Sequence, residues 1–246
     1  MLNIYSYYIY INIAIGTCRI TPAINHLNST YIDKYITRPT NSSELLQLIK
    51  FLKYKNIKEE NFKYIFEYSI NRKRKIKDNI IKKAISLFNN ENVKYIFEIC
   101  SKKCNVYNKT LFSHYTASSL IIDKYGKIRS WFSKNEVNNL KLKILSFEEI
   151  ERDITKIKEE LNNKKFIIVG HYVTQFSGDR YELNEWLKKI CLKLNIIFID
   201  PIQEIKKNDK NFNTDKYFVK EIKLIHLNKE GEKIMKLIFN NFLKLI

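Results

Sequence analysis

The sequence predicts an α/β protein with three layers, in which helices cover both faces of a central, mostly parallel five-stranded sheet. Short apolar runs alternate with longer amphipathic segments, as is typical of a parallel sheet covered by helices. Hydrophobic residues make up 45% of the chain and aromatic residues 13%, which is enough to build a core. No internal repeat, flexible linker or shift in composition divides the chain, so we expect a single domain over residues 1–246.

The strand candidates are short runs rich in Ile, Val, Phe and Tyr. They lie at residues 8–16, 93–100, 165–171 and 196–200, with a shorter one at 35–37. The 8–16 run is apolar but has no basic start and no small-residue cleavage site, so it fits a buried strand better than a signal peptide.

Amphipathic spacing and capping residues predict the helices. A turn and an Asn or Ser cap after Arg38 precede a helix that places Leu45, Leu48, Ile49 and Leu52 on one face. Further helices are expected at residues 60–68, 77–89, 146–161, 181–194 and 230–245. Residues 104–133 show no clear period, so we expect a long loop or small insertion there.

The net charge of +18 points toward nucleic acid or an anionic surface. However, the chain is rich in Ile, Lys, Asn and Tyr and poor in Gly and Pro, the bias of an AT-rich genome, and its lysines are spread along the whole length. The dense basic run at 71–77 fits a solvated helix face, so nucleic acid is an unlikely partner. No stretch is long and uncharged enough to span a bilayer.

The four cysteines do not have the paired spacing of a metal site, and no cofactor-binding motif is present, so we expect neither a metal nor a cofactor. Free thiols and the lack of a leader segment favour a reducing cytoplasm.

Functional side chains of an open parallel sheet gather where the carboxyl ends of strands meet the starts of helices. Five stretches fall at such positions: 16–19, 40–42, 100–102, 170–172 and the segment after Asp200 and Pro201.

Two of the motifs resemble the SGNH (GDSL-like) hydrolases. Gly16-Thr17-Cys18 is similar to the family's first block, and His226-Leu227-Asn228 followed by Gly231 is similar to its last. A cysteine in the first block is the pattern of GSCFA-like relatives and of a capsule-polysaccharide branch associated with acyl transfer. The segment "RPTNSSELLQLI" stands where the family has its second block, and "EICSK" where it has its third.

The resemblance implies the flavodoxin-like SGNH topology, Cys18 as nucleophile and His226 as its base. A thiol suits this role because a helix N-terminus or an imidazolium lowers its pKa, and Arg19 adds a positive charge nearby. The family's aspartate before the histidine is replaced by Lys223. Asp215, Glu221 or a backbone carbonyl are the alternatives for orienting the imidazole.

The remaining candidates would bind substrate or stabilise an oxyanion. Gly16 and Thr17 form the turn, and the oxyanion donors are sought among the backbone N–H groups of Cys18 and Arg19, Asn41 with Ser42, and Ser101. His114 and His171 are either substrate contacts or structural histidines. Arg180 is either a helix-start ion-pair partner or a ligand for an acidic group of the substrate.

Three functional hypotheses follow. The first is an acyl hydrolase or acyltransferase that acts on a small-molecule or carbohydrate ester, with an acyl donor in the transfer reaction. The second is a protein of the same fold that binds a glycan or acyl donor without turnover, suggested by Lys223. The third is a basic nucleic-acid-associated protein, which rests on net charge and the 71–77 run and lacks the aromatic-basic pattern of a known module.

Overall fold

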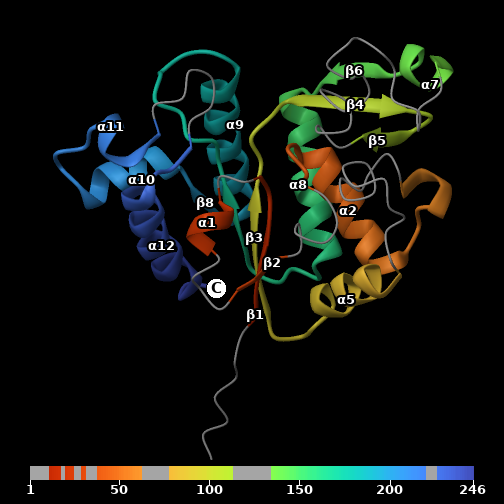
Figure 1. Ribbon diagram of the computed structural model, residues 1–246, viewed down its shortest axis with the longest axis horizontal. Helices are drawn as coiled ribbons and strands as arrows, with labels where there is room; N and C mark the ends of the chain where they lie inside the picture. The colour runs from red at the N-terminus through yellow and green to blue at the C-terminus, as the bar shows by residue number, and fades with distance from the viewer. Residues whose placement is uncertain are drawn as a thin grey trace, which may run out of the picture.

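The centre of the protein is a parallel five-stranded sheet in the order β2-β1-β3-β7-β8. The computed structural model describes residues 11–17, 20–24, 29–31, 38–62, 78–112, 134–219 and 226–246. The strands are β1 (Ile11–Ile15), β2 (Ser29–Tyr31), β3 (Val93–Glu98), β7 (Phe166–Val169) and β8 (Ile197–Ile199). Helices cover this sheet, which confirms the predicted α/β class (Figure 1).

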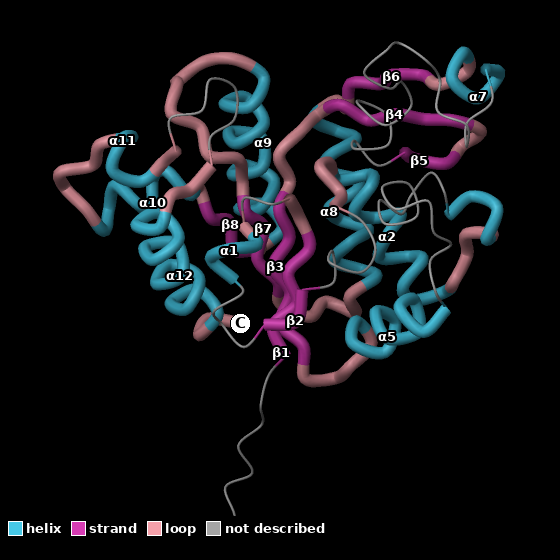
Figure 2. Tube along the Cα trace, in the orientation of Figure 1, coloured by secondary structure: helices cyan, strands magenta, loops and turns pink. Residues whose placement is uncertain are grey.

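The helices form two layers with the sheet between them, as Figure 2 shows with the sheet seen nearly edge-on. One layer contains α2 (Ser42–Tyr54), α5 (Asp78–Phe88), α8 (Phe147–Glu160) and α9 (Asp179–Leu194). The other contains α1 (Thr21–Ile24), α10 (Pro201–Asn208), α11 (Thr214–Tyr217) and α12 (Lys229–Leu243).

Each strand contributes side chains to both layers because successive residues of a strand point to opposite faces. In β3, Tyr95 and Phe97 enter the core beneath α2 and α8, whereas Ile96 enters the core beneath α12. In β1, Ile13 enters the core beneath α2 and α8, and Ala14 enters the core beneath α12. Strands that are apolar on both faces explain the continuous hydrophobic runs in the sequence.

Helix boundaries follow the capping residues. Ser146 caps α8 with a complete capping box, in which its side chain accepts from Glu149 N–H while the Glu149 carboxylate accepts from Ser146 N–H. The predicted helices at 77–89, 146–161, 181–194 and 230–245 are confirmed as α5, α8, α9 and α12. The short α10 was not predicted, although Asp200 as N-cap and Pro201 at its first position signal a helix start.

Part of the stretch expected to be a long loop or small insertion, residues 104–133, belongs to a small antiparallel sheet, β5-β4-β6, and residues 113–133 lie outside the described residues. This sheet contains β4 (Lys103–Tyr107), β5 (Thr110–Phe112) and β6 (Lys141–Ile144), and α7 (Lys134–Asn138) precedes β6. The β4–β5 turn has positive φ at Asn108 and Lys109, +45° and +65°, as a tight two-residue hairpin requires. Lysine at the second position gives this turn no recognisable sequence signal.

Two expected elements fall partly or wholly outside the described residues. The strand expected at 35–37 lies outside them. On the side of β1 away from β3, the neighbouring strand is β2, at Ser29–Tyr31. Of the helix at 60–68, only residues up to 62 are described, and they include a 3-10 turn, η1 (Glu59–Asn61). Among the described helices, none has both the length and the apolar character needed to cross a bilayer.

The Glu44 carboxyl group, in the first turn of α2, is buried. Glu44 Oε2 accepts hydrogen bonds from Thr40 N–H at 2.8 Å and from Thr40 Oγ1 at 3.3 Å. Its other oxygen, Oε1, has no hydrogen-bond partner among the described residues. Burial raises the pKa of Glu44 to about 8 against the hydrogen bonds from Thr40 and Asn41, so this carboxyl group is mostly protonated at neutral pH.

We predict that Glu44 makes the protein less stable as the pH rises. Below about pH 4.5 the carboxyl is protonated in both states; above it the unfolded chain releases the proton while the folded chain retains it until about pH 8. Its contribution to folding is therefore complete at low pH and is lost as the pH rises through about 8. The stability of Glu44→Gln relative to the unchanged protein should increase across this range, by about 1.4 kcal/mol per pH unit at most.

Urea unfolding at several pH values measures this difference. Glu148→Gln is the matched control, because Glu148 is exposed and its pKa is lowered, so it stays ionised in this range. A Glu44→Gln difference that is independent of pH would contradict the prediction.

Candidate functional site

The turn at the end of β1 is held by a buried carboxylate on the neighbouring strand. Glu98, the last residue of β3, is completely buried, and its Oε2 accepts from both Thr17 N–H and Thr17 Oγ1 at 2.6 Å. A buried carboxyl oxygen that lost these hydrogen bonds would pay the cost of leaving water without a partner. The backbone at Thr17, one residue before Cys18, is therefore fixed to the central strand.

Glycine at position 16 is required by this contact. A Cβ atom added to Gly16 would lie 2.5 Å from Glu98 Cβ and 2.8 Å from Ile20 Cδ1, closer than real Cβ contacts. The close approach of β1 and β3 at the site of the Glu98 bonds thus explains why the apolar run ends in glycine. Cys18 and Arg19 themselves lie outside the described residues.

Asn41 and Ser42 were expected to contact substrate, but their polar atoms bind within the protein. Asn41 caps α2: its Oδ1 accepts from Glu44 N–H at 2.9 Å, and its Nδ2 donates to Lys103 O at 2.9 Å. Ser42 Oγ donates to Asp153 Oδ2 at 3.0 Å. Both residues are completely buried, and these contacts give them a role in positioning α2, while their expected role in substrate binding stays a prediction.

The loop after β3 is tied to the loop before α2. The backbone N–H groups of Cys100 and Ser101 both donate to Thr40 O, at 2.8 and 2.9 Å, and Ser101 Oγ accepts from Lys103 N–H. The Ser101 N–H is consequently engaged and is not aimed at a substrate. Of the oxyanion donors expected from the sequence, those on Cys18 and Arg19 stay as predictions.

Lys102 joins the same loop to the start of α9. Its side chain is only 8% exposed, lies 3.0 Å from Asp179 and 2.5 Å from Glu182, and stacks over the Trp186 ring. Burial lowers the pKa of Lys102, but the hydrogen bonds that its ammonium donates to Glu182 and Asp179 outweigh burial and raise the pKa above its ordinary value. Lys102 is therefore a permanent cation that anchors the rim of the sheet.

His171 lies at the end of β7 but is almost fully buried, at 1% exposure. Asn184 of α9 holds its backbone on both sides, accepting from His171 N–H and donating to His171 O at 2.9 Å. The ring Nδ1 lies 3.0 Å from Tyr172 O. These contacts favour the structural alternative for His171 over a substrate contact.

His226 lies at the carboxyl edge of the sheet. Lys94, near the start of β3, donates to Leu243 O, and Lys165, just before β7, donates to Leu245 O. The end of α12 therefore lies at the amino ends of the strands. A helix of 15 residues is about 22 Å long, so α12 begins at the opposite edge of the sheet, and Figure 1 shows the helix running between the two edges. His226 precedes this helix by three residues.

The residues after His226 have a structural explanation. Asn228 Oδ1 accepts from the N–H groups of Glu230 and Gly231 and caps α12. A Cβ atom on Gly231 would collide with Tyr217 O. Asn228 and Gly231 thus serve the start of α12. The half-buried His226 is the residue of this motif whose side chain is still a candidate for catalysis.

The His226 turn packs against the end of β7 through aromatic rings. Leu227 forms an isolated antiparallel bridge with Phe218, and the Phe218 ring contacts Tyr172 edge-on at 5.8 Å. Val219 N–H donates to His226 O at 2.9 Å. The turn is therefore fixed to the same rim that carries His171 and Tyr172.

The other site candidates are less informative. His114 lies outside the described residues, as do Glu221 and Lys223. Arg180 is exposed near the start of α9, where its neighbours Asp179 and Glu182 form the ion pairs with Lys102. Asp215 is exposed in α11.

The cysteines inside the fold are buried free thiols. Cys100, Cys104 and Cys191 form no disulfide, and burial raises the pKa of both Cys104 and Cys191 to about 12. Within the described part of the chain, no group of three or more His, Cys, Asp or Glu side chains is placed to hold a metal ion.

Glu98 was missed at the sequence level. It ends an otherwise apolar strand, "VKYIFE", and a carboxylate at the carboxyl end of a buried strand was the available signal. Comparisons with known proteins add no assignment, because no family model, curated protein or solved structure matches this chain.

We predict that the Thr17 hydroxyl contributes to stability through Glu98. Thr17→Val keeps the shape and the N–H bond but removes the hydroxyl donor from a buried carboxyl, and it should lower the free energy of unfolding by about 1–3 kcal/mol. Thr17→Ser keeps the donor and should lose less. Urea unfolding of both variants tests this, and equal stability of the Val and Ser variants would contradict the role of the hydroxyl.

Proposed function

We propose that this protein is an SGNH-like acyl hydrolase or acyltransferase in which Cys18 is the nucleophile and His226 its base. The observation that carries the proposal is the pair of Glu98–Thr17 hydrogen bonds. They fix the backbone immediately before Cys18 at the edge of the sheet where His226 also lies. Preorganised backbone next to a nucleophile is what acyl transfer requires.

The strand order also supports this fold assignment. Counting only the strands of the main sheet, β2-β1-β3-β7-β8 corresponds to 2-1-3-4-5, the order of flavodoxin-like doubly wound sheets. The resemblance implies that topology for an SGNH-like enzyme. The order alone does not define a reaction, since one fold supports many functions.

In the proposed reaction, the Cys18 thiol transfers its proton to His226, and the thiolate attacks the carbonyl carbon of an ester. The C–S bond forms as the carbonyl electron pair moves to oxygen. Collapse of this adduct expels the alkoxide, which takes the proton from the imidazolium and leaves as an alcohol. His226 then deprotonates water or an acceptor hydroxyl, whose oxygen attacks the thioester carbonyl; the C–S bond breaks, the acyl group leaves as the acid or new ester, and the imidazolium returns its proton to the Cys18 thiolate.

The acyl adduct needs donors for its negative oxygen. Because the N–H groups of Cys100 and Ser101 are bound to Thr40 O, we assign this role to the backbone N–H groups of Cys18 and Arg19. Carbohydrate esters are the proposed substrate class. Buried free thiols fit a reducing compartment, so we propose a cytoplasmic location.

We expect Cys18 to be the reactive thiol. Iodoacetamide at a pH of about 6, followed by peptide mapping, should modify Cys18 first, because an active-site thiolate is stabilised below its ordinary pKa. Cys104 and Cys191, buried and with pKa values of about 12, should react only after unfolding. Modification of Cys18 no faster than that of the other cysteines would argue for a fold without catalysis.

We expect esterase activity to require both groups. Hydrolysis of p-nitrophenyl acetate should fall by about 10²–10⁴-fold in Cys18→Ala and in His226→Ala. Cys191→Ala, a thiol in the core beneath α9, is the matched control and should retain the activity of the unchanged protein. Activity that survives both the Cys18 and the His226 change would overturn the proposal, and an inactive protein that still binds esters would support the non-catalytic alternative.

A further inference from the structure

Strand β8 ends the main sheet, and its outer edge opens into a groove. Among the described strands, β8 pairs only with β7, in the register Ile167–Ile197 to Val169–Ile199. Gly170 N–H donates to Ile199 O, so the backbone groups of Ile197 and Ile199 face β7. Because backbone groups alternate along a strand, those of Phe198 face outward.

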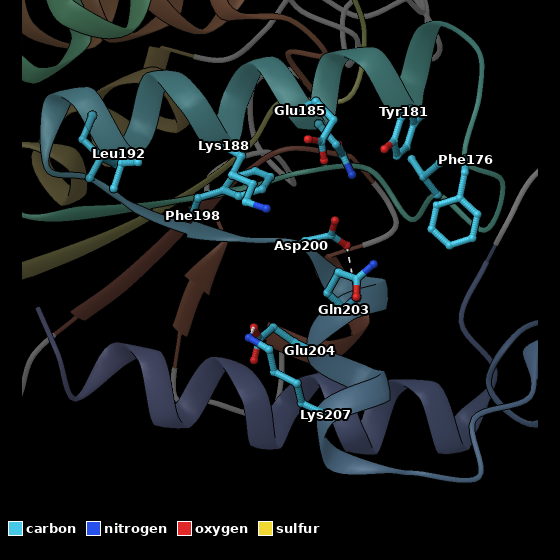
Figure 3. Close-up of a pocket in the computed structure, with 13 residues that line it drawn as sticks. Phe176, Tyr181, Glu185, Lys188, Leu192, Phe198, Asp200, Gln203, Glu204 and Lys207 are labelled. Atoms are coloured by element: carbon cyan, nitrogen blue, oxygen red, sulfur yellow. Dashed lines mark hydrogen bonds and ion pairs between the residues drawn. The ribbon is translucent and has the colours of Figure 1, made fainter.

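The groove runs along this edge between α9 and α10, with a volume of about 520 Å³. Figure 3 shows α9 on one side of β8 and α10 on the other. Its wall on α9 extends from Tyr181 to Leu192, which is about 16 Å along the helix. That length matches about five residues of an extended strand.

Exposed apolar side chains mark the two ends of the groove. Phe176 is 71% exposed at the end near the carboxyl terminus of β8, and Leu192 is 83% exposed at the other end (Figure 3). They are the two most exposed large hydrophobic residues among those described. Strand edges open to solvent are usually protected by charge or proline, and Ile197–Ile199 contains neither.

The middle of the groove carries opposite charges on one helix face. Glu185 and Lys188 lie one turn apart on α9 and line the groove. Within the described part of the chain, neither takes part in an ion pair within 4.0 Å. Glu204 and Lys207 on α10 repeat the pattern and are paired with each other at 2.6 Å.

We propose that this groove is the interface for a second copy of the chain, with β8 of one copy antiparallel to β8 of the other. A two-fold axis near Phe198 places each end of the groove in one copy against the opposite end of the groove in the other copy. Phe176 of one copy then covers Leu192 of the other, and Glu185 of each copy faces Lys188 of the other. The outward N–H and C=O of Phe198 join the two sheets into one.

A self-complementary surface favours a second copy over an unrelated peptide. In an isologous interface, each end of the groove meets the opposite end of the same groove in the other copy. Phe176 at one end can therefore contact Leu192 at the other, and the acidic Glu185 can contact the basic Lys188. The net charge of +18 on each copy opposes association at long range. Salt screens that repulsion beyond about 8 Å at physiological ionic strength, while contacts in the groove are shorter.

Sedimentation analysis of the full chain over a wide concentration range tests the proposal. We expect a reversible dimer of twice 29.6 kDa. Glu185→Lys and Lys188→Glu each place like charges across the axis and should weaken the dimer at least tenfold, whereas the double exchange Glu185→Lys/Lys188→Glu should restore it. Leu192→Glu should dissociate it, and Leu237→Glu, on exposed α12, should not.

Hydrogen exchange adds a readout at the strand itself. The Phe198 amide should exchange more slowly as the protein concentration increases, and this protection should vanish in Leu192→Glu. A monomer at all concentrations would overturn the proposal, as would a dimer that ignores the charge exchange and leaves Phe198 exchange unchanged. Capture of a displayed peptide by this groove in a monomeric protein would also overturn it, in favour of a different partner.

Discussion

The hydrogen bonds from Thr17 to the buried Glu98 carboxylate are the constraint on which the candidate site depends. A carboxylate enclosed at the end of the central strand is costly unless its oxygens are hydrogen-bonded. Thr17 provides two donors to one oxygen, and Gly16 leaves the space that this approach needs. The consequence is that the chain leaves β1 in one fixed direction, immediately before the cysteine proposed as nucleophile.

Hydrogen bonds elsewhere on the rim have the same effect of fixing loops to one another. Thr40 O accepts from the loop after β3, Lys102 ties that loop to α9, and Asn184 clamps the end of β7. These contacts position a few groups firmly and engage several polar atoms of the rim within the protein. For that reason, residues that look available in the sequence, such as Asn41 and Ser42, are engaged in the fold.

The layered architecture was predictable because apolar strands and amphipathic helices leave strong periodic signals. The strands β1, β3, β7 and β8 and the helices α5, α8, α9 and α12 follow from such patterns. The hairpin of β4 and β5 did not, since its turn uses Asn108 and Lys109 in a backbone conformation for which lysine gives no signal. Short elements such as β2 and α10 depend on tertiary contacts more than on local preference.

The site was predictable only in part. Placement of residues at the carboxyl edge follows from the topology, which is why the Gly16 turn and His226 were sensible candidates. Which side chains are already satisfied depends on partners far away in sequence: Ser42 on Asp153, Asn41 on Lys103 and Thr17 on Glu98. Spacing along the chain does not encode those pairings.

We propose that the anchored turn presents a nucleophilic thiol, Cys18, to an ester. Mass spectrometry of the protein after brief exposure to p-nitrophenyl acetate tests this directly, with peptide mapping to locate the acetyl group. We expect a single acetyl thioester on Cys18, which disappears with time in the unchanged protein and forms slowly in His226→Ala. Acetyl groups distributed over surface lysines, with none on Cys18, would contradict the claim.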